Sequence, residues 1–109
     1  MNRGQMKVDQ RQPIHVRFLQ FHLANPHVYR KLRELSLFAK RHGAKKIGIA
    51  LLFERLRWWS MFETKGDVFK LCNDYRAYYA RVLMNNEPEL AGFFEIRSQS
   101  IYAKTGSEG

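Results

Sequence analysis

Residues 35–52 read LSLFAKRHGAKKIGIALL, and the spacing of their apolar residues predicts the two central helices. Four of its residues match the spacing A-x3-G-x5-I-x2-L, namely Ala39, Gly43, Ile49 and Leu52. A helix-turn-helix needs these residue types: a small residue where the helices cross, a glycine turn in a left-handed conformation, and two aliphatic residues that pack the second helix onto the first. Leu35 adds a core contact one turn earlier. We therefore predict a helix-turn-helix with these five residues as its core.

The helical pattern continues on both sides of this stretch. Val28 and Leu32 extend the apolar stripe, which predicts a helix over residues 26–42. Asn25 can cap its first turn through the side-chain oxygen, and Pro26 suits the first helical position because no N–H is needed there. Other apolar stripes predict helices over residues 14–24, 45–57 and 88–94, and one from Asn73 or Asp74 to about Asn85.

The composition changes between residues 62 and 71. Phe62-Glu63-Thr64 and residues 68–71 are short β-prone pieces, and Lys65-Gly66-Asp67 between them is typical of a hairpin turn. The sequence thus predicts a mainly α fold, a small helix-turn-helix or winged-helix-like domain of about five helices with a short β-hairpin. We place this domain at residues 13–97, between flexible tails at residues 1–12 and 98–109.

Positive charge is concentrated in the middle of the chain. Lysine and arginine total 19 against 10 acidic residues, for a net charge of +9. Residues 30–57 alone hold nine basic and two acidic residues, a net +7. A concentrated positive field attracts polyanions such as nucleic acid. The expected DNA-contacting residues are Lys40, Arg41, Lys45, Lys46, Arg55, Lys65 and Lys70.

These features favour a small DNA-binding protein that acts on double-stranded DNA, with transcriptional regulation as the expected role. Helix 45–57 would enter the major groove with Lys45 and Lys46 at its N-terminal end, and the hairpin would steady it as a wing. Two half-sites require a homodimer. The expected interface is the edge of Trp58 and Trp59, because two adjacent helix positions do not face the same core, or alternatively the C-terminal helix.

Two alternatives stay open at the level of the sequence. The first is a protein-binding module that inhibits or modulates a host enzyme or defence system, with the basic face on an acidic protein partner. It is favoured by Ile47, Ala50 and Leu51, which are apolar for a surface that reads bases. The second and weaker alternative is single-stranded nucleic acid binding through the aromatic side chains of residues 58–79.

Catalytic and metal-binding patterns are missing from the sequence. Cys72 is the only cysteine, the four histidines have no ligand partner at metal-site spacing, and there is no paired-carboxylate or phosphate-loop motif. We therefore expect neither an enzyme nor a cofactor or metal. No apolar run approaches the roughly 20 residues of a membrane helix, and residues 1–12 contain no apolar stretch of a secretory signal, so we expect a cytoplasmic protein without membrane contact.

Several runs of the sequence together resemble a group of small uncharacterised proteins of bacteriophages and prophages. The runs are Asn25-Pro26-His27-Val28-Tyr29, Gly48-Ile49-x-x-Leu52-Phe53-Glu54 with Arg57-Trp58, Phe69-Lys70-Leu71-x-Asn73-x-Tyr75-Arg76 with Tyr79-Ala80-Arg81, and Pro88-x-Leu90-Ala91-Gly92-Phe93-Phe94. The resemblance covers about residues 18–97, and Cys72 and Asp74 replace asparagines of the pattern. It implies a setting, a phage-type protein inside a bacterial cell, and no activity.

Overall fold

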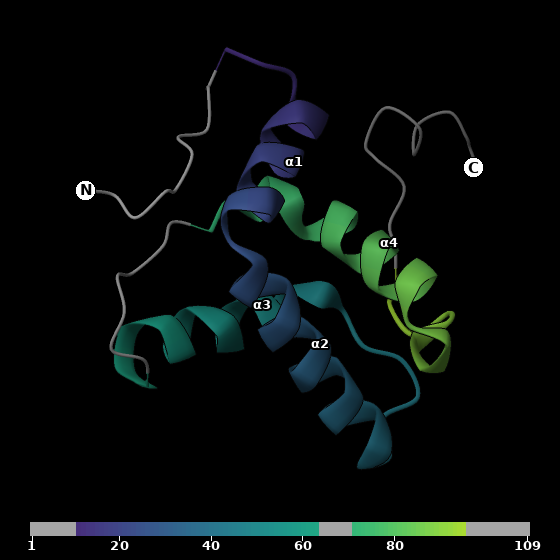
Figure 1. Ribbon diagram of the computed structural model, residues 1–109. Helices are drawn as coiled ribbons and strands as arrows, with labels where there is room; N and C mark the ends of the chain where they lie inside the picture. Colours follow the sequence, from purple (N-terminus) through teal and green to yellow (C-terminus); the bar gives the residue numbers. More distant parts are fainter. Residues whose placement is uncertain (1–10, 64–70, 96–109) are drawn as a thin grey trace, which may run out of the picture.

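The computed structural model describes residues 11–63 and 71–95 of the chain (Figure 1). This part is mainly helical and contains no strand beyond one isolated bridge. The α-helices are α1 (Ile14–Ala24), α2 (Pro26–Arg41), α3 (Ile49–Trp58) and α4 (Arg76–Asn86). A π-helical turn, η1 (Trp59–Glu63), continues α3, and two 3-10 turns, η2 (Asn73–Tyr75) and η3 (Pro88–Leu90), flank α4.

The junction of α1 and α2 lies at the predicted Asn25-Pro26 boundary, but Asn25 has another role than expected. Its side chain makes no capping hydrogen bond to α2. Instead, Asn25 Nδ2 donates to the Phe21 carbonyl at 3.0 Å, and the Asn25 backbone N–H donates to the same oxygen at 2.9 Å. Asn25 therefore closes α1 and is buried there, while Pro26 begins α2 as predicted.

The end of α2 is set by Gly43, which has the expected positive φ of 105°. The Gly43 N–H donates to the Lys40 carbonyl at 3.1 Å, and the Ala44 N–H donates to the Ala39 carbonyl at 3.0 Å. This pair of bonds is the Schellman arrangement, which satisfies the last carbonyls of a helix and requires a left-handed residue. The turn chemistry read from the glycine is therefore confirmed.

The start of α3 differs from the sequence prediction. The helix begins at Ile49 and not at Lys45. The cause is a contact distant in sequence: Ile47 N–H donates to the Phe93 carbonyl and Glu95 N–H donates to the Ile47 carbonyl, both at 3.0 Å. These bonds form a parallel bridge between Ile47 and Phe94, so the backbone at residue 47 is extended and residues 42–48 form a loop.

Two further expectations need correction. Phe62 and Glu63, expected in a strand, belong to the helical turn η1. The expected hairpin tip at residues 65–67 lies outside the described residues, as do the C-terminal tail and residues 1–10 of the N-terminal tail. The last expected helix, 88–94, is shortened to η3, because Phe94 is engaged in the bridge to Ile47.

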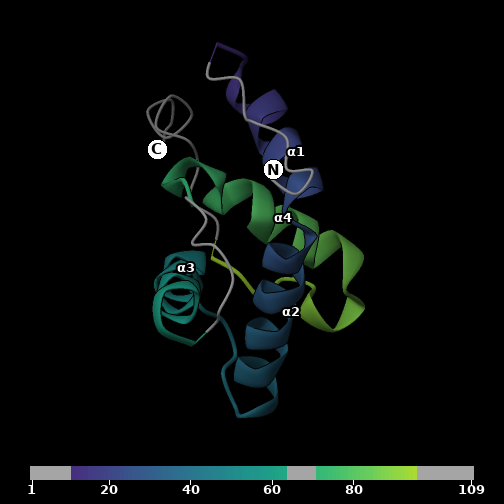
Figure 2. The same ribbon diagram turned by 60° about the vertical axis from the view of Figure 1, so that its left-hand side comes forward.

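All four α-helices contribute to one core. The fully buried large side chains come from α2, α3, α4, η3 and the segment after η3, and they include Leu32, Phe53, Leu56, Tyr79, Leu83, Leu90 and Phe93. Phe18 of α1 packs on Tyr78 and Tyr79 with ring-centre distances of 5.1 and 4.8 Å. Figure 2 looks nearly along the axis of α3 while α2 lies across the view, so these two helices are steeply inclined to each other.

Candidate nucleic-acid interface

The α2–α3 pair brings the five expected core residues together. Ile49 and Leu52 of α3 are buried, and Leu35 and Ala39 of α2 are partly buried against the same core. Gly43 makes the turn between the two helices. The loop of residues 42–48 is longer than the three or four residues of an ordinary helix-turn-helix turn. The structure is thus a helix pair with the predicted packing and an extended connection.

The two expected base-contacting lysines do not lie on α3. Lys45 and Lys46 are exposed in the loop that precedes the helix. The exposed residues of α3 before Arg55 are Ala50, Leu51 and Glu54. Two apolar side chains and a carboxylate offer no hydrogen-bond donor to guanine edges or phosphates. The prediction that the lysines occupy the N-terminal end of this helix is therefore wrong.

The cations of α2 are partly neutralised by two glutamates that follow α4. Arg41 holds Glu89 with both ends of its guanidinium, through Nε at 3.0 Å and Nη2 at 2.8 Å. Arg33 Nε lies 2.9 Å from Glu87, whose carboxylate also accepts a hydrogen bond from the Tyr29 hydroxyl at 3.0 Å. The hydrogen bond from Arg41 lowers the pKa of Glu89 below its ordinary value. These contacts join α2 to the segment around η3.

Nothing in the local pattern reveals these two glutamates as partners, since they lie 48 and 54 positions beyond their arginines. The only local signal was their acidity next to Pro88, in a region of net negative charge.

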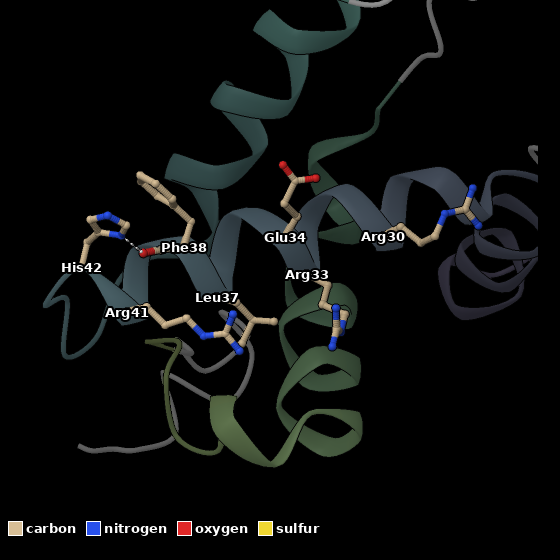
Figure 3. Close-up of a pocket in the computed structure, with 7 residues that line it drawn as sticks. All are labelled: Arg30, Arg33, Glu34, Leu37, Phe38, Arg41 and His42. Atoms are coloured by element: carbon tan, nitrogen blue, oxygen red, sulfur yellow. Dashed lines mark hydrogen bonds between the residues drawn. The ribbon is translucent and has the colours of Figure 1, made fainter.

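An open groove of about 600 Å³ runs along α2. Figure 3 shows Arg33 and Arg41 on one side of the helix with Leu37 between them, and Glu34 and Phe38 on the other side. His42 stacks on Phe38 with a ring-centre distance of 4.0 Å, and its Nδ1 lies 2.8 Å from the Phe38 carbonyl. The lining residues are Arg30, Arg33, Glu34, Leu37, Phe38, Arg41 and His42. Three guanidinium groups therefore border one groove.

The other lysines and arginines of this region differ in the contacts that they make with the rest of the chain. In the described part of the chain, no carboxylate lies within ion-pair distance of Arg30, Lys45 or Lys46. Lys40 Nζ lies 5.8 Å from the centre of the Phe93 ring. Arg55 is exposed on α3. Lys65 and Lys70 lie outside the described residues.

The adjacent tryptophans point to different surroundings, as their spacing predicts. Trp58 is exposed and packs on Phe62 with a ring-centre distance of 4.7 Å. Trp59 is partly buried, and Lys31 Nζ lies 5.1 Å from the centre of its ring. Of the two tryptophans, only Trp58 is therefore available at the surface as a contact residue.

The histidines and the cysteine form no ligand cluster. Within residues 11–63 and 71–95, no three His, Cys, Asp or Glu side chains gather closely enough to hold a metal. His22 lies between aromatic rings, stacked on Phe18 at 5.6 Å and edge-on to Tyr79 at 5.6 Å. Burial lowers the pKa of His22 below its ordinary value of 6.5. Cys72 is a partly buried free thiol.

Comparisons with known proteins identify no relative of this chain. No protein-family model matches the chain, and no curated protein or solved structure is significantly similar to it. Among the described residues, none of the helices has both the length and the apolar character to cross a membrane.

Proposed function

We propose that this protein binds double-stranded DNA through its phosphates, using the basic surface of α2 and the loop that follows it. The observation that carries the proposal is a pair of exposed lysines, Lys45 and Lys46, which have no carboxylate within ion-pair distance among residues 11–63 and 71–95. Such cations on a loop gain most from a polyanion, because no ion pair with the described part of the chain has to be broken first.

The docking differs from a groove-reading recognition helix. Because the N-terminal part of α3, before Arg55, exposes only Ala50, Leu51 and Glu54, the contacts that we propose come from the loop and from Arg30 and Lys40 on α2. Phosphate contacts fix a protein on the duplex and carry little sequence information. We therefore infer a helix-turn-helix-like protein that binds duplex DNA with low sequence preference. The resemblance to phage proteins adds the setting of a bacterial cell.

Two further arginines of the α2 surface, Arg33 and Arg41, are ion-paired with Glu87 and Glu89. Arg33 and Arg41 are exposed, and exposed ion pairs contribute little stability because water and salt screen them. A DNA phosphate can replace the Glu89 carboxylate as the partner of Arg41. A guanidinium binds either group, the planar carboxylate or the tetrahedral phosphate, with two N–H groups. The basic surface can thus extend when DNA is close.

Fluorescence anisotropy with a labelled duplex, titrated across a salt series, tests the proposal. Four cations in contact with phosphates give a log–log salt slope of about −3 to −4. The double variant Lys45→Glu, Lys46→Glu should lose most of the affinity, because it reverses the two charges on which the proposal rests. Both side chains are exposed, and Ile47 uses only backbone atoms for its bridge, so the fold should persist.

A matched control changes the same amount of charge elsewhere. Arg76 and Arg81 are exposed on α4, and Arg76→Glu with Arg81→Glu again lowers the net charge by four. If both double variants weaken binding equally, attraction depends on net charge alone and the assigned surface is wrong. Absence of duplex binding by the parent protein at low salt would reject DNA binding itself.

A further inference from the structure

The outward face of the continuous helix formed by α3 and η1 carries large apolar side chains. Leu51, Trp58, Met61 and Phe62 are 63%, 56%, 60% and 64% exposed. Leu51, Trp58 and Phe62 stand at i, i+7 and i+11, so they form one stripe along the helix. We call these four residues the α3 apolar face.

The opposite side of the same helix is already occupied by the core. Ile49, Leu52, Phe53 and Leu56 are buried there. A helix that is apolar on both sides is normally buried on both sides. The α3 apolar face exposes on the order of 400–500 Å² of side-chain area, if each side chain has a full area of about 200 Å². Patches of this size on a small protein commonly mark an interaction surface.

The pair of Trp58 and Phe62 gives this face a rigid centre. Their rings pack at 4.7 Å between centres with an interplanar angle of 52°. The π-helical turn η1 begins directly after Trp58, and such turns often occur at functional positions of helices. Tryptophan is also the residue type that most often dominates the binding energy of protein interfaces. The pair therefore has the chemistry of an anchor for another protein.

The charge around the face selects the kind of partner. Arg55 is exposed within the stripe, between Leu51 and Trp58. Lys31 lies over the ring of the neighbouring Trp59 and is paired with Glu34 at 3.2 Å. The carboxylate of Glu54 is engaged by Arg57 Nη1 at 2.9 Å, so its charge is balanced. A second copy of the chain would bring another net charge of +9 to this surface. The exposed area is also only about half of the roughly 800 Å² per side of a stable protein complex.

We propose that the α3 apolar face binds an acidic amphipathic helix of a partner protein. Apolar side chains of that helix would cover Trp58 and Phe62, and its carboxylates would surround them, where the net charge of +9 attracts an acidic partner. This surface is separate from the lysines of the DNA-binding proposal, which lie in the loop before α3. The inference therefore goes beyond the proposed function and does not depend on it.

Two synthetic helical peptides with the same leucine stripe test the proposal, one with glutamate and one with lysine at the remaining positions. Binding to the full chain is followed by fluorescence anisotropy of the labelled peptide. We expect the acidic peptide to bind with a Kd of about 1–100 µM, and the basic peptide at least about tenfold more weakly. The double variant Trp58→Ser, Phe62→Ser should weaken acidic-peptide binding by about tenfold or more.

Two control variants separate this face from other causes of binding. Leu19→Ser with Leu23→Ser removes two exposed leucines from α1 and should leave peptide binding unchanged. Lys45→Glu with Lys46→Glu should remove most of the DNA affinity and change peptide affinity less than about threefold, because screening limits charge effects to about 10 Å. Circular dichroism of each variant checks the helical fold.

Every other outcome overturns the proposal. No acidic-peptide binding up to about 1 mM, or equal binding of both peptides, removes the acidic partner. A dimer in analytical ultracentrifugation that Trp58→Ser with Phe62→Ser abolishes would assign the face to a second copy. Single-stranded DNA binding that depends on Trp58 and Phe62 would assign it to stacked bases.

Discussion

The helices α2 and α3 form one pair, yet their outward faces differ in chemistry. The face of α2 carries arginines, and Glu87 and Glu89 hold two of them in place. The face of α3 carries leucine, tryptophan, methionine and phenylalanine that remain exposed. The large exposed apolar side chains are thus concentrated on α3 and η1, whereas the α2 face has one, Phe38, among its arginines. A polyanion and an apolar partner can therefore be bound by different surfaces.

The two helices also differ in how many of their faces serve the fold. α2 is amphipathic, with Val28, Leu32 and Leu37 in the core and charged residues outside. α3 has apolar residues on both sides, and only one side touches the core. The stability of the isolated chain should therefore depend on the inner side of α3 and not on the outer one.

The largest expected effect is the loss of stability when a leucine on the inner side of α3 is replaced by alanine, compared with the same change on the outer side. Leu56 is fully buried, so Leu56→Ala should lower the free energy of unfolding by about 2–5 kcal/mol through lost burial and a cavity. Leu51 makes the same chemical change at an exposed position, and Leu51→Ala should cost less than about 0.5 kcal/mol. Urea unfolding followed by circular dichroism measures both.

The distinction between the two sides of α3 is wrong if Leu56→Ala and Leu51→Ala lower the free energy of unfolding equally. Equal losses would mean that the outer side of α3 is covered within the folded chain in solution. The α3 apolar face would then be part of the core and would not be available to a partner.

Helix positions could be predicted from the sequence wherever local residues set them. α1 has the predicted bounds 14–24, and α2 ends one residue before the predicted position, because Pro26 and Gly43 act through their own backbone preferences. The start of α3 could not be predicted in this way. It depends on the bridge from Ile47 to Phe94, which joins residues 47 positions apart.

The cations of the candidate site could be predicted from the sequence, but their ion pairs could not. The concentration of cations over residues 30–57 is visible in the sequence. Which of them are held by carboxylates depends on the return of the chain after α4, which places Glu87 and Glu89 beside α2. Local pattern also suggested strand at Phe62, whereas the helix continues through η1.

A smaller effect is expected when one cation of α2 is released. Glu89→Gln removes the carboxylate that holds Arg41 and leaves that guanidinium free for a phosphate. DNA affinity should rise several-fold, and the salt slope should steepen by about one unit. Anisotropy titrations across a salt series measure both quantities.

Glu54→Gln is the matched control on α3. It makes the same change in net charge and releases an ion pair of Arg57, which remains bound to the Leu71 carbonyl at 3.1 Å and to Asn73 Oδ1. An equal gain of affinity in both variants would show that net charge, and not the position of Arg41, sets DNA binding.

The smallest effect is a loss of stability in mild acid on the α2 side of the molecule. His22 of α1 lies edge-on to Tyr29 of α2 at 5.7 Å and to Tyr79 of α4, and its Nδ1 is buried without a hydrogen-bond partner in the described structure. Burial lowers the pKa of His22 in the folded protein. α3 contains no histidine, so its packing should respond least.

The sign follows from proton uptake. Below the ordinary histidine pKa of 6.5, the unfolded chain binds a proton that the folded chain excludes, so acid favours unfolding. The stability associated with neutral His22 is complete above pH 6.5 and decreases as the pH falls toward the lowered pKa. His22→Phe keeps a ring against Phe18, removes the unpaired nitrogen and should flatten this part of the pH profile of urea unfolding. A variant profile that falls as steeply as the parent profile would show that acid acts through other groups.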